Sequence, residues 1–185
     1  AKYCSETEVK KFIHVSAIGA SANSKSLYQQ SKFSGEQKAL NNFKNTIIVR
    51  PSVVCGVEDN FTNLFAKLSL SPVIPVVKPD YKFQPILVDD VATTIVKAIE
   101  IKKNEGKIYE IGGPTVISFK DMVKSIMGTI QKKRFIVEMP MPLAKIQAAL
   151  FSLMPKPLLT KDQCEILNEA DNIVSNNHLT LNDLS

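Results

Sequence analysis

Three side chains near the start of the chain are of the types needed to move a proton: Ser16, Tyr28 and Lys32. Tyr28 and Lys32 lie in the helical stretch SLYQQSKFSGEQ, one turn apart, so both project from one face. An ammonium about 4 Å from the phenol, at an effective dielectric near 20, would favour the phenolate by roughly 4 kcal/mol, or about three pK units. Tyr28 would then act as a general acid or base near neutral pH, while Ser16 would hydrogen-bond the substrate oxygen.

The same pair also has a plain structural interpretation. The chain holds 23 Lys and Arg residues, nearly all of them lysine, so a tyrosine followed by a lysine one helical turn later is a weak signal. A half-buried tyrosine beside a lysine that extends its ammonium to solvent would give the same pattern. The residues alone leave both interpretations open.

A strand, a helix and a second strand surround these residues. The run FIHVS at 12–16 precedes a small-residue loop and a proline-free helical segment over 25–42. TIIVR at 46–50 is a continuous apolar run that stops at Pro51, as is typical of strands covered on both faces in a parallel sheet. This order predicts a βαβ crossover unit. Ser16 would lie at the carboxyl end of its strand, where active groups gather in open α/β sheets.

The rest of the chain alternates short strands with amphipathic helices. We expect a helix beginning at Asp59 or Asn60, an irregular segment at 71–85, strands near 86–88, 108–111 and 134–138, an apolar helix near 142–154, and helices capped by Asp90, Ser118 and Thr160. No internal repeat or low-complexity segment interrupts this pattern.

The composition favours a globular domain and argues against several other classes. The 185 residues are 44% hydrophobic with a formal net charge of +5, and no basic run is interleaved with aromatic residues. We therefore expect a solvated lysine surface and no nucleic-acid interface. Cys4, Cys55 and Cys164 form no CxxC pattern, so we expect reduced thiols in a cytoplasm-like compartment and no metal site. No apolar run reaches the roughly 18–20 residues needed to span a bilayer.

Two polar features have structural interpretations that we favour. His14 lies inside the first strand, and we expect a core histidine with its hydrogen bonds satisfied. Asp89 and Asp90 are adjacent on the chain and do not share a face, so a helix cap is favoured over an acid–base pair.

The helix near 142–154 carries a stripe of large aliphatic residues, formed by Leu143, Ile146, Leu150 and Leu153. We expect this stripe to pack into the core. Docking to a partner or to a membrane-bound complex is the alternative.

Several segments together resemble the extended and atypical short-chain dehydrogenase/reductases, the NAD-dependent epimerase/dehydratase-like proteins. In order along the chain these segments are FIHVSAIGA, YQQSK, IIVRPSVVCG, FQPILVDDVA and YEIGGP. The likeness is greatest to the branch that holds the Rossmann-type accessory subunit of respiratory complex I and its bacterial relatives. HVSAIGASANSKSLYQQSKFSGE and LTKDQCEIL are similar to that branch.

The resemblance implies roles for the residues that match the family motifs. Ser16, Tyr28 and Lys32 would be the catalytic trio. The nicotinamide nucleotide, NAD or NADP, would contact Val15, Tyr28, Lys32 and the segment Pro51, Ser52 and Val53 that follows the arginine. Gln84 would contact the substrate, a carbonyl compound or a sugar nucleotide. A non-catalytic NAD(P)H-binding accessory or assembly subunit of respiratory complex I is the alternative function.

The resemblance also implies a fold, from which this chain departs in one respect. The fold is α/β, a partial doubly wound Rossmann-type parallel sheet with a small α/β substrate-side region. Residues 1–57 would form the second half of the nucleotide-binding domain, and 58–185 the substrate-side and carboxyl-terminal region, with strands near 86–88 and 108–111 returning to the core. The seven glycines form no GxGxxG loop, so the cradle that binds the nucleotide phosphates is absent. We therefore expect this chain to be the carboxyl-side portion of a longer protein.

Expectations about partners and location follow from the same likeness. The partners would be a small-molecule substrate or respiratory-complex subunits. A sheet without its first strands would leave an apolar edge, so we expect a homo-oligomer or pairing with the absent amino-terminal portion. The location would be the bacterial cytoplasm, with peripheral association at the inner membrane, or the mitochondrial matrix in a eukaryote.

Overall fold

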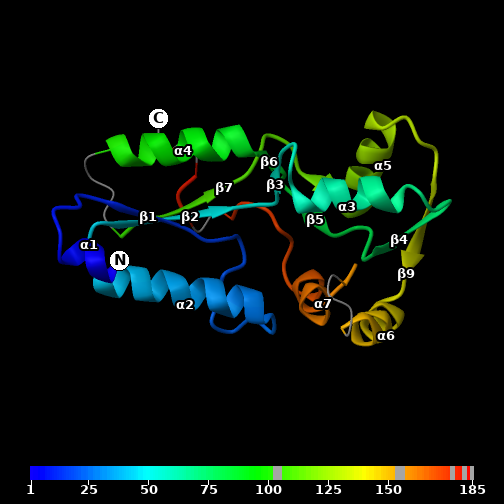
Figure 1. Ribbon diagram of the computed structural model, residues 1–185, viewed down its shortest axis with the longest axis horizontal. Coiled ribbons are helices and arrows are strands. Elements are labelled where there is room, and N and C mark those ends of the chain that lie inside the picture. Colours follow the sequence, from blue (N-terminus) through cyan, green and yellow to red (C-terminus); the bar gives the residue numbers. More distant parts are fainter. Residues whose placement is uncertain (102–105, 153–156, 176–177, 181–182, 184–185) are drawn as a thin grey trace.

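A three-stranded parallel sheet organises the first part of the molecule (Figure 1). The computed structural model describes residues 1–101, 106–152, 157–175, 178–180 and 183. Strands β1 (Phe12–Val15), β2 (Thr46–Pro51) and β7 (Ile108–Ile111) lie in the order β1-β2-β7, and both pairings are parallel. Every residue of β2 is buried, as the run without alternation predicted for a strand covered on both faces.

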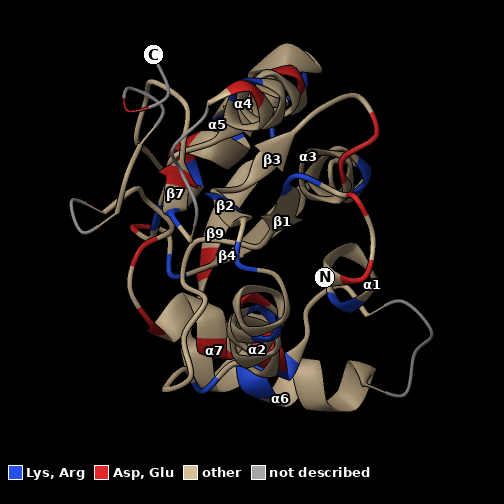
Figure 2. Ribbon diagram, turned by 90° about the vertical axis from the view of Figure 1, so that its left-hand side faces the viewer, with Lys and Arg blue, Asp and Glu red and all other residues tan. Residues whose placement is uncertain are grey.

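Two helices cover the opposite faces of this sheet. Helix α2 (Leu27–Asn42) connects β1 to β2, and α4 (Val88–Glu100) precedes β7. Figure 2 shows the strands between these two helices, with basic and acidic segments interspersed along the chain. The β1-α2-β2 unit confirms the predicted crossover, and the α/β class expected from the sequence is present.

The two edges of the sheet differ. The outer edge of β7 is paired, because Glu110 N–H donates to the carbonyl of Leu179 at 2.8 Å. On β1, Phe12 and Ser16 turn their amides toward β2, so the main-chain groups of Ile13 and Val15 face outward. Within the described residues no strand pairs with that side of β1. The exposed edge expected from the sequence is therefore present.

The remaining elements form a second region around three short strand pairs. β3 (Val54–Cys55) pairs with β6 (Ile86–Leu87) and β4 (Val73–Val77) with β9 (Phe135–Met139), both parallel, while β5 (Lys82–Phe83) pairs antiparallel with β8 (Ile117–Ser118). The helices of this region in the described part of the chain are α3 (Asn60–Leu68), α5 (Phe119–Thr129), α6 (Met141–Phe151) and α7 (Lys161–Asn168), whereas the short α1 (Lys2–Ser5) lies against α2.

The segment 71–85 is more regular than its prolines suggested, because it contains β4 and β5. The ladder with β9 explains why Pro75 is tolerated. Phe135 N–H donates to the carbonyl of Pro72, which puts the even-numbered residues of β4 on the paired side. Pro75 then lies on the unpaired edge, where a missing N–H costs no ladder hydrogen bond.

Helix caps are largely as predicted. The Asp59 carboxylate accepts from Thr62 N–H at 2.6 Å, and Ser118 caps α5 by accepting from Asp121 N–H. Thr160 forms a full capping box at the start of α7. The cap predicted at Asp90 is wrong, because α4 already begins at Val88. Asp90 lies instead in the first turn, where its charge favours the positive end of the helix dipole.

Each region has its own apolar core. Ile47, Val49, Ile86, Tyr109 and Ile111 belong to the core beneath α4. The core of the second region is built on aromatic rings, namely Phe61, Phe65, Tyr81, Phe83 and Phe119, with neighbouring centroids 4.9–5.8 Å apart. Several of these pairs meet edge to face, the arrangement that ring quadrupoles favour.

Helix α6 faces the opposite way from the sequence-based prediction. Ala144 and Ala148 are buried, whereas the side chains of Leu143, Ile146 and Leu150 are more than half exposed. The small alanines let α6 lie close to the second core, which turns the aliphatic stripe outward. Leu153, the fourth member of the predicted stripe, lies outside the described residues. No helix in the described part of the chain has the length and apolar content to cross a membrane.

Candidate functional site

Ser16 lies where the sequence predicted, directly after the carboxyl end of β1. Its backbone N–H donates to the carbonyl of Val49 at 2.7 Å, which fixes the residue against β2. The residue is 3% exposed, and its Oγ has no hydrogen-bond partner among the described residues. A buried hydroxyl without a partner costs free energy, so it is the kind of group that a ligand or a water would satisfy.

The loop from Ser16 to α2 is tightly fixed. Gly19 has φ +87°, and a Cβ there would collide with the side chain of Gln29 on α2. Gln29 Oε1 in turn accepts from Ser24 Oγ at 2.7 Å. Ser26 caps the helix by accepting from the N–H of Gln29. The start of α2, which carries Tyr28, is therefore held by its own loop.

Tyr28 and Lys32 share a face of α2 as predicted, but their polar atoms are arranged differently from the expectation. Lys32 Nζ lies 5.7 Å from the centroid of the Tyr28 ring and 3.4 Å from the carbonyl oxygen of Val15. The ammonium thus lies over the ring and beside the free edge of β1. This is a cation–π geometry, in which the ring face and not the hydroxyl meets the charge.

The pKa of Tyr28 moves in the opposite direction from the one expected. Partial burial raises the pKa of this phenol above its ordinary value, because the charged phenolate loses more solvation on burial than the neutral phenol. The residue is 46% exposed, and its hydroxyl makes no hydrogen bond in the part of the chain that the structure describes. In this chain by itself Tyr28 is a neutral phenol that can donate a hydrogen bond.

Asp162, at the start of α7, holds the amino-terminal end of α2. Its carboxylate accepts from Leu27 N–H at 2.6 Å, from Ser26 Oγ at 2.8 Å and from Tyr28 N–H at 3.3 Å. These amides have no partner within the helix itself, and the helix dipole makes the position favourable for an anion. A carboxylate from the second region therefore fixes the backbone of Tyr28.

A second carboxylate from the same segment holds the preceding loop. Glu169 Oε1 accepts from Lys25 N–H at 2.6 Å and from Ser24 Oγ at 2.9 Å. Sequence reasoning missed both Asp162 and Glu169. The capping box at Thr160 predicted the helix that carries Asp162, but no spacing indicates which element a surface carboxylate will meet.

The segment after Arg50 is largely occupied by internal hydrogen bonds. Ser52 Oγ donates to Asn172 Oδ1 at 2.6 Å, and Val53 N–H donates to the same oxygen at 3.0 Å. The carbonyl of Pro51 accepts from Ile18 N–H. Pro51 and Ser52 are buried, so Val53 is the one predicted cofactor contact of this segment that is partly exposed. Asn172 of the carboxyl-terminal segment already uses the donors of Ser52 and Val53.

Gln84 is the predicted substrate contact, and its amide bridges main-chain groups. Its Nε2 donates to the carbonyl of Gly113 at 2.8 Å, while its Oε1 accepts from Val174 N–H at 3.0 Å. The backbones approach closely here, since a Cβ on Gly113 would strike the carbonyl of Pro85. In this arrangement Gln84 joins three segments of chain.

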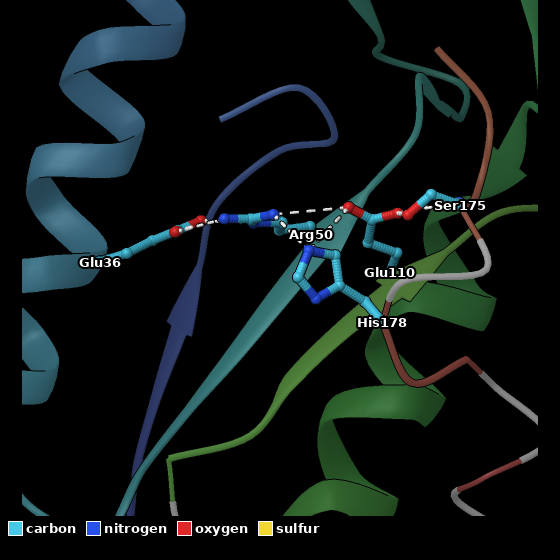
Figure 3. Close-up of polar contacts among 5 residues, drawn as sticks. All are labelled: Glu36, Arg50, Glu110, Ser175 and His178. Carbon is cyan, nitrogen blue, oxygen red and sulfur yellow. Dashed lines mark hydrogen bonds and ion pairs between the residues drawn. The ribbon is translucent and has the colours of Figure 1, made fainter. Parts of the chain in front are cut away.

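A buried ionic cluster positions α2 on the sheet (Figure 3). Arg50 of β2 forms a bidentate pair with Glu36 of α2, at 2.7 and 2.8 Å, and Nη1 lies 3.5 Å from Glu110 of β7. His178 Nε2 is 3.1 Å from the same Nη1. Ser175 N–H and Oγ donate to the second oxygen of Glu110.

The carboxylates of the cluster explain why the pKa of Arg50 is raised although the residue is buried. Burial alone would lower the pKa of its guanidinium, but the hydrogen bonds and charge of Glu36, aided by Glu110, raise the pKa overall. Glu36 lies one turn after Lys32, so the ion pair fixes the helix face that carries the candidate site. Sequence reasoning missed this cluster, although an arginine inside an apolar strand was a usable signal.

His14 faces α2 and carries an unsatisfied nitrogen. Its Nε2 is buried without a hydrogen-bond partner among the described residues, so the prediction of a satisfied core histidine is wrong. Gly35 leaves the space that the ring occupies, since a Cβ there would lie 3.2 Å from Nε2. Burial first, and then the charge of Lys32, lower the pKa of His14. No metal-binding group of His, Cys, Asp and Glu occurs within the described residues.

The sequence is similar to one protein family model and to subunits of a mitochondrial enzyme. The sequence model of the RmlD substrate binding domain matches residues 18–158. The mitochondrial NADH dehydrogenase [ubiquinone] 1 alpha subcomplex subunit 9 of Mus musculus is 35% identical, over 92% of this chain and 46% of that protein. The subunit of the same name from Dictyostelium discoideum is 33% identical, over 96% of this chain and 51% of that protein.

A solved structure supports the fold. The UDP-glucuronic acid 4-epimerase from Bacillus cereus, crystallised with UDP-glucuronic acid and NAD, superposes with a TM-score of 0.59. It shares 22% identity and covers 93% of this chain and 59% of that chain. At this identity the likeness establishes the Rossmann-type epimerase fold and nothing further. The chain spans about half the length of the curated relatives it matches.

Proposed function

This chain belongs to the RmlD substrate binding domain family, and on that premise we propose that it is the carboxyl-side part of an NAD(P)(H)-binding protein. The observation that carries the proposal is the buried, unpartnered Oγ of Ser16 at the carboxyl end of a parallel strand, with the Lys32 ammonium beside the neighbouring Val15 carbonyl. Ligands of open α/β sheets bind at this end of the strands.

The residues fit a nicotinamide nucleotide on one side of the site. Lys32 offers donors for ribose hydroxyls, and the partly exposed Val53 offers apolar surface for a flat ring. The glycine-rich phosphate cradle is not in this sequence, so we propose that the phosphates bind to residues outside this chain. When bound, the nucleotide would supply or accept a hydride.

A reductase or epimerase role assigns a proton step to this chain. Tyr28 would donate or accept the proton of a carbonyl or sugar-nucleotide oxygen, and Ser16 Oγ would hydrogen-bond that oxygen. The raised pKa keeps Tyr28 protonated at neutral pH but also makes it a weaker acid. For proton transfer in either direction, Lys32 would have to move from the ring face toward the hydroxyl.

A second candidate function is favoured by the relatives. Those at 33–35% identity carry the name of a mitochondrial NADH dehydrogenase subunit. We therefore propose as the alternative that the protein is a non-catalytic, nucleotide-binding accessory or assembly subunit of respiratory complex I. Its location would then be mitochondrial, on the matrix side. In this role Ser16, Tyr28 and Lys32 would bind the nucleotide without turnover.

The unpaired edge of β1 bears on partners in either role. Ile13 and Val15 present their main-chain groups outward from a parallel strand. We propose that another strand pairs with this edge, either from the amino-terminal portion of the protein or from a second copy. Light scattering of this chain alone is expected to show dimers or larger species, and a clean monomer at high concentration would contradict the proposal.

The test of function compares Tyr28→Phe with Tyr3→Phe in the full-length protein. Tyr3 is 80% exposed on α1 and serves as the matched control. Co-purifying nucleotide is measured by mass spectrometry, and turnover on a panel of carbonyl compounds and sugar nucleotides by absorbance at the nicotinamide band. Turnover lost only in Tyr28→Phe supports the enzyme, whereas bound nucleotide without turnover in the wild type supports the accessory role. A wild-type protein that binds no NAD(H) or NADP(H) overturns both.

A further inference from the structure

The second region contains an apolar cavity that neither proposed role uses. Its volume is about 230 Å³, and it lies between α3, β4, α6 and α7. The aromatic cluster forms part of its wall, through Phe61, Phe65, Phe83 and Phe119. None of the residues of the candidate nucleotide site lines it.

The lining is almost entirely hydrocarbon. Aliphatic walls come from Leu64 and Leu68 of α3 and from Ile166 and Leu167 of α7. Strand β4 and the loop before α7 add the remaining aliphatic lining, with Pro75, Val77, Leu158 and Leu159. The polar lining residues are Gln147 and Gln163, and no described lining residue carries a charge. Gln163 already uses its Oε1 to accept from Thr160 N–H at 2.9 Å. Two amide groups and no charge on so apolar a surface make it a poor site for a phosphate or a sugar.

The walls of the cavity are fixed by packing. Phe65 and Phe119 meet edge to face at 5.6 Å, and Phe83 and Phe119 do so at 5.4 Å. On the α7 side, the capping box at Thr160 and the buried Cys164 hold the helix in place. A rigid frame prevents the side chains from collapsing into the space, so the cavity is part of the packed structure.

The volume of the cavity and its apolar lining together indicate what kind of ligand fits. An apolar cavity of roughly 150 Å³ stays dry and admits benzene, whereas sites for drug-sized molecules begin near about 300 Å³. The cavity here falls between these sizes. We propose that it binds a single hydrocarbon chain, either a fatty acyl chain or an isoprenoid tail. The inference is independent of nucleotide binding, because the two sites share no residue.

The test uses the full-length protein with two probes, dodecanoate for the acyl source and farnesol for the isoprenoid source. Each is titrated in competition with the fluorescent fatty acid cis-parinaric acid. Displacement by dodecanoate alone identifies acyl chains, and displacement by farnesol alone identifies isoprenoids. Failure of cis-parinaric acid and both probes to bind overturns the proposal.

Filling variants locate the binding. Leu64→Trp and Ile166→Trp enlarge side chains on opposite walls, and each is expected to weaken probe binding by about tenfold or more. Leu150→Trp makes the same change on the exposed face of α6 and is expected to leave binding unchanged. Probe affinity equal to wild type in both folded filling variants would overturn the proposal.

A measurement on the wild type covers the case in which a filling variant does not fold. Nuclear Overhauser effects are recorded between the methylene protons of dodecanoate, or the methyl protons of farnesol, and the aromatic protons of Phe61 and Phe83. Contacts from the bound probe to these rings support the site. Contacts only to exposed residues such as Leu150 would show adventitious surface binding and overturn it. Co-purified nucleotide, measured in parallel, separates this result from the proposed function.

Discussion

The sheet region and the second region of this protein have opposite interiors. Almost every buried polar residue found in the described part of the chain lies in the sheet region, including Ser16, Glu36, Arg50 and Glu110, while Ser69 is the exception in the second region. The second region is filled by aromatic and aliphatic side chains around an apolar cavity. One interior is specified by charge and hydrogen bonds, and the other by shape.

The difference matters for the chemistry that each region can support. A polar interior has groups whose protonation and pairing respond to a bound nucleotide, as the unpartnered Oγ of Ser16 and Nε2 of His14 indicate. An apolar interior has no such groups, and it can only select a ligand by its volume and hydrophobicity. Among the contacts between the regions, the Asp162 carboxylate accepts from the backbone of α2, and the Glu169 carboxylate accepts from the backbone of the loop before it.

The largest effect on stability is expected from removing the charge at the centre of the polar interior. Arg50→Ala leaves the carboxylate of Glu36 buried without its partner and that of Glu110 with the Ser175 hydrogen bonds, so we expect a loss of about 3–5 kcal/mol in the free energy of unfolding. Urea denaturation followed by circular dichroism measures it. Arg134→Ala is the control, because Arg134 is the other arginine and bonds to a carbonyl of Ser69 at 2.7 Å. A loss no larger than in that control would show that the cluster does not hold the sheet region together.

The second largest effect is expected from a substitution that creates a new cavity in the apolar interior. Phe119→Ala removes a ring that meets Phe61, Phe65 and Phe83, and we expect a loss of about 3 kcal/mol that does not depend on salt. Phe135→Ala, at a ring that is 76% exposed, is expected to change stability by less than about 0.5 kcal/mol. Denaturation at low and high salt tests the comparison. A salt-dependent loss in Phe119→Ala would mean that the two interiors are not distinct.

A smaller effect is expected where the regions meet. Asp162→Ala removes the acceptor for Ser26, Leu27 and Tyr28, and we expect a loss of about 1–2 kcal/mol. The amides at the start of α2 should exchange faster with solvent, which hydrogen-exchange mass spectrometry detects. Lys161→Ala, the neighbouring exposed residue, is the control. Unchanged exchange at α2 would contradict the role given to Asp162.

Local patterns predicted much of the fold. The unbroken apolar run of β2, the helix that carries Tyr28 and the caps at Asp59, Ser118 and Thr160 are each visible in the sequence because each depends on neighbouring residues. The orientation of α6 was not predicted. A stripe of Leu143, Ile146 and Leu150 indicates an amphipathic helix, but only the tertiary structure shows that Ala144 and Ala148 occupy the close contact.

The candidate site was predictable in its residue types and not in its polar contacts. The helical spacing put Tyr28 and Lys32 on one face, but it could not show that the ammonium lies over the ring and beside Val15. Nor could it show that Asn172, more than a hundred residues away, uses the donors of Ser52 and Val53. Such contacts depend on where distant segments return, and that information is not local.

The smallest expected effect is on the pH dependence of stability, and it should arise from a residue of the polar interior alone. The pKa of His14 is lowered, by burial first and then by Lys32, so the unfolded chain takes up a proton at higher pH than the folded protein. The free energy of unfolding should therefore fall as pH drops from about 7 through the folded pKa of His14. His14→Gln should flatten this slope, whereas Phe119→Ala should keep it. Denaturation between pH 7 and pH 5 measures the slopes, and nuclear magnetic resonance titration of the ring gives the pKa directly. Equal slopes in His14→Gln and wild type would show that the unsatisfied nitrogen does not couple stability to pH.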